Sequence, residues 1–154
     1  MNHKIHKVLA LLTMSCVASA SPNMLKAVAT VESSNNPQAV GDSGKARGLY
    51  QMHEPAWKQV SESRQKRGLK VWPWAYAHDA YVSGIYAQEY LKWLSDGLQK
   101  RLGRAPLDWE VYAAYNRGLQ GFANLNYDYS CLPNHTKRAC QKIALYTQSS
   151  VPKR

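Results

Sequence analysis

Residues 24–37, MLKAVATVESSNNP, decide how the chain begins to fold. Leu25, Val28 and Val31 recur at the three- and four-residue spacing of an α-helix, so the segment predicts a helix with one apolar stripe. Residues 35–37, Asn-Asn-Pro, should end this helix, because proline disfavours helix in the residue before it and has no amide hydrogen to donate.

Glu32 is the informative side chain of this helix. It follows Leu25 and Val28 by seven and four residues, so the three share one helical face. Burial beside the stripe and the negative end of the helix dipole both disfavour a carboxylate, so we expect the Glu32 pKa to be raised. A carboxylic acid that stays protonated near neutral pH can give a proton to a leaving oxygen. A boundary glutamate whose carboxylate reaches solvent is, however, the commoner structure at such a position.

The rest of the chain predicts a mainly helical single domain around a short glycine-rich loop or hairpin. Residues 40–48 contain three glycines with Asp and Ser, which is typical of turns. Apolar periodicity and helix-ending residues predict four further helices, over residues 55 to about 64, 78–102, 106–115 and 136–146. Residues 119–129, rich in Asn and Tyr, are expected to form a loop.

Residues 1–20 have the features of a secretory signal. Lys4 and Lys7 precede an apolar run that is too short to span a bilayer, and residues 18–20, Ala-Ser-Ala, form a small-x-small cleavage site. We therefore expect a mature domain of residues 21–154 that is periplasmic or secreted and has no stable membrane span. A retained N-terminal anchor is the alternative.

The chain is basic, with a net charge of +10 that falls to +8 when the signal leaves. This charge favours anionic partners such as wall phosphates, lipid headgroups or nucleic acid, or simply a solvated basic surface. No base-reading or phosphate-binding motif accompanies it, so no nucleic-acid partner is expected.

Loss of the signal leaves Cys131 and Cys140, an even pair in a compartment that permits disulfides. We expect a disulfide that ties a C-terminal helix, residues 131–148, to a core of about residues 24–129. The alternative is half of a metal site, but only His135 lies between the cysteines, so no metal and no cofactor is expected.

Three short motifs occur in order along the chain: ESSNNPQA at residues 32–39, GLYQ at 48–51 and AYNRG at 114–118. Together they resemble the lytic transglycosylases of the soluble-lytic and goose-type lysozyme group, within the lysozyme-like superfamily. That group carries Glu-Ser before Asn-Pro-x-Ala, then Gly-Leu-hydrophobic-Gln, then Ala-Tyr-Asn-x-Gly. The similarity covers about residues 24–118.

The resemblance implies a lysozyme-like α+β fold and a lytic transglycosylase that cuts the MurNAc-GlcNAc β-1,4 bond of peptidoglycan to give 1,6-anhydro-muropeptides. Glu32 matches the family's single catalytic acid and base. The positions that match its substrate-binding residues are Ser33, Tyr50, Gln51, Tyr115 and Asn116. By analogy alone, an exported enzyme of this size suits local wall opening for a secretion or conjugation apparatus.

The orientation of Asp42 decides between two reactions, hydrolysis and formation of the anhydro sugar. The family often has a serine in this loop, where Gly41 or Ser43 falls here, whereas small invertebrate and phage lysozymes place a second carboxylate there. If Asp42 faces the cleft, it could activate water or act as a nucleophile and the bond would be hydrolysed. If it caps a turn, the product is the anhydro sugar. A non-catalytic peptidoglycan-binding module is a further alternative.

Aromatic side chains are the remaining candidates for sugar contacts. Tyr127 and Tyr129 are expected in the cleft wall. A stacking platform could come from the tryptophans at positions 72, 74, 93 and 109, at least two of which should be core. His53 is expected to help begin the second helix rather than to act in catalysis.

Overall fold

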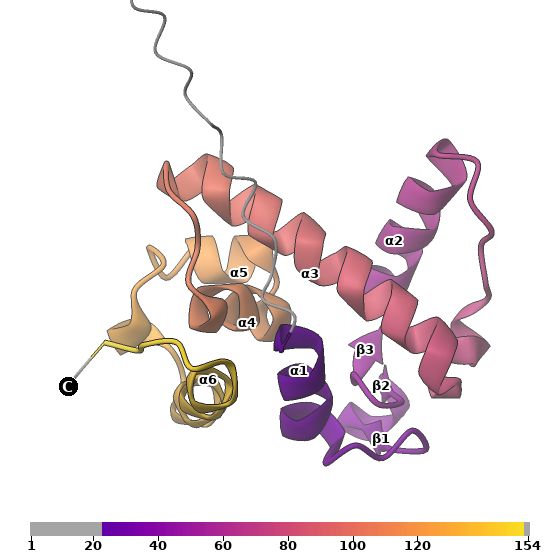
Figure 1. The fold of residues 1–154 in the computed structure, drawn as a ribbon, viewed down its shortest axis with the longest axis horizontal. Coiled ribbons are helices and arrows are strands. Elements are labelled where there is room, and N and C mark those ends of the chain that lie inside the picture. Colours follow the sequence, from indigo (N-terminus) through magenta and orange to yellow (C-terminus); the bar gives the residue numbers. More distant parts are fainter. Residues whose placement is uncertain (1–22, 153–154) are drawn as a thin grey trace, which may run out of the picture.

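The computed structural model describes residues 23–152, which form six α-helices, three 3₁₀ helices and a three-stranded sheet (Figure 1). In chain order the elements are α1 (Met24–Ser33), β1 (Val40–Gly41), η1 (Asp42–Gly44), β2 (Ala46–Arg47), β3 (Met52–His53), α2 (Glu54–Lys66), η2 (Trp74–His78), α3 (Ala80–Leu102), α4 (Asp108–Arg117), α5 (Leu119–Ala123), η3 (Tyr129–Cys131) and α6 (Asn134–Thr147). The sheet is antiparallel in the order β1-β2-β3, with Val40 opposite Arg47 and Ala46 opposite His53.

The long helix α3 connects two groups of elements. The strands and α2 lie towards one end of the molecule, α4, α5 and α6 lie towards the other, and α1 lies between α6 and the strands (Figure 1). Helix α4 packs against α6, α3 and α5, and α1 packs against α6. The C-terminal end of α1 is thus held where the two groups meet.

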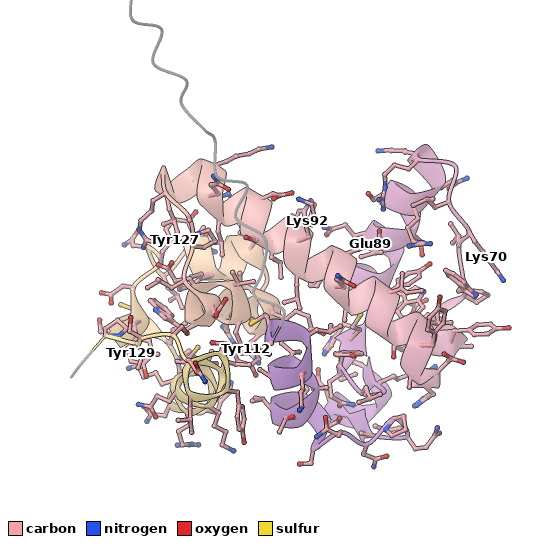
Figure 2. All side chains as sticks on the ribbon, in the orientation of Figure 1. Lys70, Glu89, Lys92, Tyr112, Tyr127 and Tyr129 are labelled. Carbon is pink, nitrogen blue, oxygen red and sulfur yellow. The ribbon has the colours of Figure 1, made fainter. Side chains whose placement is uncertain are left out.

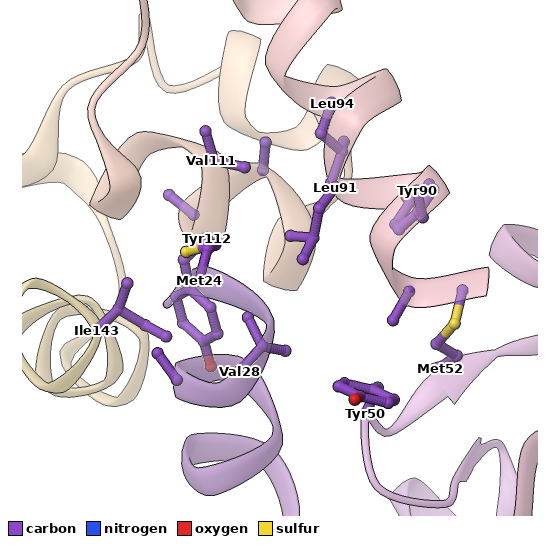
Figure 3. Packing of buried hydrophobic residues seen from close by; sticks show 14 of the residues in the cluster. Met24, Val28, Tyr50, Met52, Tyr90, Leu91, Leu94, Val111, Tyr112 and Ile143 are labelled. Carbon is purple, nitrogen blue, oxygen red and sulfur yellow. The ribbon is translucent and has the colours of Figure 1, made fainter. Parts of the chain in front are cut away.

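The core forms around α1 and α4. Met24 and Val28 of α1, Tyr112 of α4 and Ile143 of α6 are at most 2 % exposed and pack together with α3 (Figure 3). Burying a side chain of this size stabilises a fold by about 1.5–3 kcal/mol. Of the stripe that the sequence predicts, only Val28 is buried, and Leu25 and Val31 are half-buried; Met24 and Ala27 complete the inner face with Val28.

Gly48 shows why the turn after β2 needs a glycine. Its φ is +74°, and a Cβ there would lie 1.8 Å from the carbonyl oxygen of Ala77. A larger residue would meet both backbone strain and a backbone clash. The turn that leads to Tyr50 and Gln51 can therefore pack directly on η2.

The predicted helices are confirmed, with bounds that differ by about two residues, but β3, α5 and the three 3₁₀ helices were missed. The hairpin gains a third strand, β3, and the predicted loop 119–129 contains α5, which buries Leu119 and Phe122. Two-residue strands and a one-turn helix are too short to produce a periodic pattern.

The predicted disulfide is not present. Cys131 is exposed, with its thiol near Asp128 and Ser130, whereas Cys140 is buried and its thiol contacts the carbonyl of Trp109 at 3.6 Å. The prediction was wrong because α6 turns Cys140 inward towards α4. Burial raises the pKa of the Cys140 thiol to about 12, which makes it unreactive.

The predicted signal and its cleavage site lie outside the described residues. Between residues 23 and 152 none of the helices combines the length and the apolar character needed to cross a membrane.

Candidate active site

Glu32 lies at the end of α1 and lines an open cleft of about 480 Å³. The cleft is formed by α1, the sheet, the C-terminal end of α4 and the start of α6; besides Glu32, its lining includes Asp42, Gln51, Tyr115, Asn116 and His135. Burial raises the pKa of Glu32 from 4.5 to about 7. The raised pKa expected from the sequence is thus found, in a carboxyl group that faces a cleft.

Tyr112 is the hydrogen-bond partner of this carboxyl group. Its hydroxyl donates to Oε1 of Glu32 at 2.9 Å. A donor stabilises the ionised form and so lowers the Glu32 pKa, but burial has the larger effect. The Tyr112 ring is buried between Ile143 of α6 and α1 (Figure 3). Glu32 is therefore oriented by a neutral group rather than by a cation that would keep it ionised.

Sequence reasoning missed Tyr112. The resemblance pointed instead to Tyr115 as a substrate-binding residue, and the Tyr115 hydroxyl donates to the carbonyl of Tyr50 at 2.6 Å. Tyr112 precedes Tyr115 by three residues and therefore shares its helical face, and the two rings stack at 6.4 Å. The three-residue spacing could have indicated that Tyr112 also lies near Glu32. The prediction followed the Ala-Tyr-Asn motif, which includes Tyr115 but not Tyr112.

Gln51, which the resemblance predicts to bind substrate, lines the cleft. Its φ of +46° is unusual for a residue with a side chain, and its amide nitrogen donates to the carbonyls of Gly48 at 2.9 Å and Ala39 at 3.2 Å. A Cβ at Gly41 would lie 2.3 Å from the Gln51 side-chain oxygen, so the glycine leaves room for this amide. The side chain thus holds its own strained turn against β1.

Ser33 and Tyr50 do not line the cleft. The Ser33 hydroxyl lies 2.8 Å from the carbonyl of Leu49 and accepts a hydrogen bond from the amide of Asn36. Tyr50 is 8 % exposed and packs in the core (Figure 3). Both residues were predicted to bind substrate, but in the structure they fix the turn before Gln51 to α1 and α4.

Asn116 lines the cleft and connects it to the last helix. Its side-chain oxygen accepts a hydrogen bond from the hydroxyl of Thr136 on α6 at 2.9 Å. Thr136 is fully buried, and the adjacent His135 is exposed and faces the cleft. Sequence reasoning missed His135 because no motif includes α6.

Asp42 also lines the cleft, but its surroundings differ from those of Glu32. Its side chain is 62 % exposed, and its carboxylate lies 3.5 Å from Nε2 of His53. Asp42 and Ser43 have φ values of +49° and +54° in the turn of η1, a conformation that Asp tolerates better than most residues. Asp42 is therefore solvated and paired, and Glu32 is the carboxyl group with a raised pKa.

Tyr127 and Tyr129 lie outside the cleft, contrary to the prediction. They line a separate hollow with Trp109 and Lys137 near η3 and α6, far from the strands (Figure 2). The loop after α5 leads to η3 and α6, so both tyrosines lie beside that part of the chain. Of the tryptophans, Trp109 is 4 % exposed and belongs to the core, whereas Trp93 is 43 % exposed.

The arrangement defines the class of the site. An acid with a pKa of about 7, held by a tyrosine hydroxyl at an open polar cleft, suits proton transfer to a leaving oxygen. Within residues 23–152, His, Cys, Asp and Glu side chains form no group of three that could hold a metal ion. The site thus has the properties of a general acid in glycosidic bond cleavage.

The chain belongs to the transglycosylase SLT domain family, whose model matches residues 13–127. The match confirms the resemblance seen in the three motifs and the lysozyme-like α+β fold. At the level of the family it gives the chain a peptidoglycan-cleaving, lytic-transglycosylase-like function and a peptidoglycan substrate. Searches of curated proteins and of solved structures give no match. Helix α6, which brings His135 to the cleft, lies beyond the matched residues.

Proposed function

We propose that the protein is a lytic transglycosylase that cuts the MurNAc-GlcNAc β-1,4 bond of peptidoglycan and leaves a 1,6-anhydro-MurNAc end. The observation that carries this proposal is the raised pKa of Glu32, about 7, in a cleft where the other carboxylate is solvated. One group that is partly protonated near neutral pH can both give and accept a proton.

Glu32 acts twice in this reaction. Its protonated carboxyl gives a proton to the bridging oxygen, the bond from that oxygen to C1 of MurNAc breaks, and the GlcNAc side leaves as an alcohol. The Glu32 carboxylate then takes the proton of the MurNAc 6-hydroxyl while O6 forms a bond to C1. Water is neither consumed nor released, and Glu32 ends protonated, ready for the next cut. The Tyr112 hydrogen bond orients the carboxyl group for both steps.

The mass of the product tests the proposal. Intact sacculi are digested, and the released muropeptides are compared by mass spectrometry with those from a known muramidase. We expect products that are lighter by one water molecule and have no reducing end, and none from Glu32→Gln. Reducing products from the unsubstituted protein would contradict the transglycosylase reaction.

Hydrolysis with Asp42 as a second carboxylate is the other candidate reaction, and the place of Asp42 in the cleft favours it. Asp42→Asn separates the two reactions in the same assay. A hydrolase needs Asp42 to activate water or form a covalent intermediate, so it would lose its reducing products. A transglycosylase keeps its anhydro products. A binding module without catalysis would sediment with sacculi and release nothing from either form.

The place of action forms part of the proposal. Peptidoglycan lies outside the cytoplasm, so we propose that residues 1–20 export the chain to the periplasm or the medium, where it opens the wall for a secretion or conjugation apparatus. N-terminal sequencing of the exported protein should give Ser21 as the first residue. A chain that stays in the cytoplasm would contradict this placement.

A further inference from the structure

A groove between α2 and α3 lies beyond the cleft. A hollow beside the cleft is lined by Gln51, Tyr115 and Asn116, which also line the cleft, and it extends to Ala56 of α2 and Tyr90 of α3. One helical turn further along each helix, a groove of about 240 Å³ begins at Gln59 and Trp93. The cleft, the hollow and the groove thus follow one another from Glu32 to the space between the two helices.

A row of aromatic rings runs from the cleft to the groove. Tyr115 lies edge-on to Tyr90 at 5.7 Å, and Tyr90 stacks on Trp93 at 5.8 Å with the ring planes 7° apart. Trp93 is 43 % exposed and lines the groove, so the indole presents ring surface to the groove while Tyr90 supports it from behind. A rigid, exposed indole is a suitable surface for the C–H face of a pyranose, because the ring face is electron-rich.

The charged side chains of the groove are paired with one another. Glu89 pairs with Arg67 and with Arg64, and Lys92 pairs with Asp96 at 2.9 Å. Figure 2 shows Glu89 and Lys92 on the side of α3 nearest α2. The residues that line the groove thus include two cations and two anions, and Arg64, which is buried beside Glu89, adds one further positive charge.

Neutral hydrogen-bonding groups complete the lining. Ser63 and Gln59 of α2 face the groove, and the amide nitrogen of Gln59 is buried with no hydrogen-bond partner among the described residues. A buried donor without a partner is costly. A small rotation of this amide would let it donate to a hydroxyl or acetamido oxygen in the groove.

From these features we infer that the α2–α3 groove is a saccharide-binding site, distant from Glu32, that holds the same glycan strand by stacking a sugar on Trp93. This inference rests on the proposed function. The site has a consequence for substrate choice: a strand long enough to reach Trp93 gains binding energy that a short oligosaccharide cannot. The enzyme should therefore prefer long glycan strands.

Binding to peptide-free glycan strands tests the inference. The Glu32→Gln protein, which should not cut, is titrated with fluorescently labelled strands, either a tetrasaccharide or long strands from sacculi, and anisotropy gives the Kd. Trp93→Ala should weaken binding of the long strands about five- to tenfold. Trp93→Phe should lose less, and the tetrasaccharide Kd should change by much less than the long-strand Kd.

Tyr81→Ala is the matched control. Tyr81 lies on the same helix, is 76 % exposed and does not line the groove, so its loss should leave both Kd values unchanged. Equal effects of Trp93→Ala and Tyr81→Ala, or an equal effect of Trp93→Ala on both ligands, would overturn the inference and leave the proposed function intact. If the parent protein bound neither ligand, the proposed function would fail and the inference with it.

Discussion

Two glutamates, the half-buried Glu32 at the end of α1 and the buried Glu110 at the start of α4, show how the same side chain is used in two ways. Glu110, 2 % exposed, accepts two hydrogen bonds from the guanidinium of Arg104, at 2.6 and 2.8 Å, and one from the amide of Leu107 at 2.7 Å. Glu32 receives one from Tyr112. A cation and a helix N-terminus stabilise the Glu110 carboxylate, whereas burial at a helix C-terminus disfavours the Glu32 carboxylate.

Burial alone therefore does not mark a catalytic acid. The groups that surround the carboxyl decide whether the charged or the neutral form is favoured. Glu110 has the partners of a structural anion and lies outside the cleft, and Glu32 lacks such partners and faces it. Substituting the two residues in the same way should therefore give opposite results in activity and in stability.

The largest expected effect is on activity. Glu32→Gln keeps the shape of the side chain but has no proton to give, so the rate of muropeptide release should fall about 10²- to 10⁴-fold, the usual contribution of a general acid. Glu110→Gln should keep a rate close to that of the unsubstituted protein. Release of soluble muropeptides from sacculi measures both. A large loss of rate in folded Glu110→Gln would contradict the division between the two glutamates.

The next effect is on stability. Glu32→Gln, which should lower activity, should raise the unfolding free energy. The Glu32 pKa is about 7 in the folded state against an ordinary value of 4.5, so between these pH values the folded state binds more protons and stability falls as pH rises. Above pH 7 an ionised Glu32 should cost roughly 3 kcal/mol. Glu32→Gln removes this cost, so its unfolding free energy should exceed that of the unsubstituted protein at pH 8 and approach it near pH 4.

Glu110→Gln supplies the contrast in the same urea titrations. Losing one partner of the Arg104 pair should lower the unfolding free energy by about 1–3 kcal/mol at neutral pH. Equal changes in the two variants, or a Glu32→Gln advantage that does not depend on pH, would show that the raised pKa of Glu32 is wrong.

The raised pKa of Glu32 was predicted from the sequence, and its hydrogen-bond partner was not. The first helix has a regular apolar stripe that ends at Asn-Asn-Pro, so both the orientation of Glu32 and its position in the last turn follow from local patterns. Tyr112 reaches Glu32 across 80 residues of sequence, because α4 and α1 both pack against α6. Such a contact depends on tertiary structure, which local patterns do not record.

Ser33, Tyr50 and the cysteines illustrate the same limit. The motif placed Ser33 and Tyr50 correctly near the site, but the choice between touching substrate and fixing a turn depends on which way each side chain points. The disulfide prediction used the number of cysteines and the expected compartment, and it could not include the inward orientation of Cys140. Patterns of residue type thus predicted the region, and side-chain direction decided the role.

The smallest expected effect concerns Tyr112. Its hydroxyl donates a hydrogen bond to Glu32, as the guanidinium of Arg104 does to Glu110. Because this donor lowers the Glu32 pKa, Tyr112→Phe should raise that pKa further above 4.5. The cleavage rate depends on protonated Glu32 and falls as pH rises through its pKa, so the alkaline limb of the pH–rate profile should move to higher pH. Loss of the orienting bond should lower the plateau rate by less than about tenfold.

Tyr115→Phe is the matched control for that profile. It removes a hydroxyl that is bonded to the carbonyl of Tyr50 instead of to Glu32, so it should leave the alkaline limb in place even if it loosens the turn before Gln51. A limb that moves to lower pH in Tyr112→Phe would mean that the hydroxyl had favoured the neutral acid. A limb that moves equally in both variants would mean that the pKa of Glu32 depends on the shape of the cleft and not on its hydrogen bond to Tyr112.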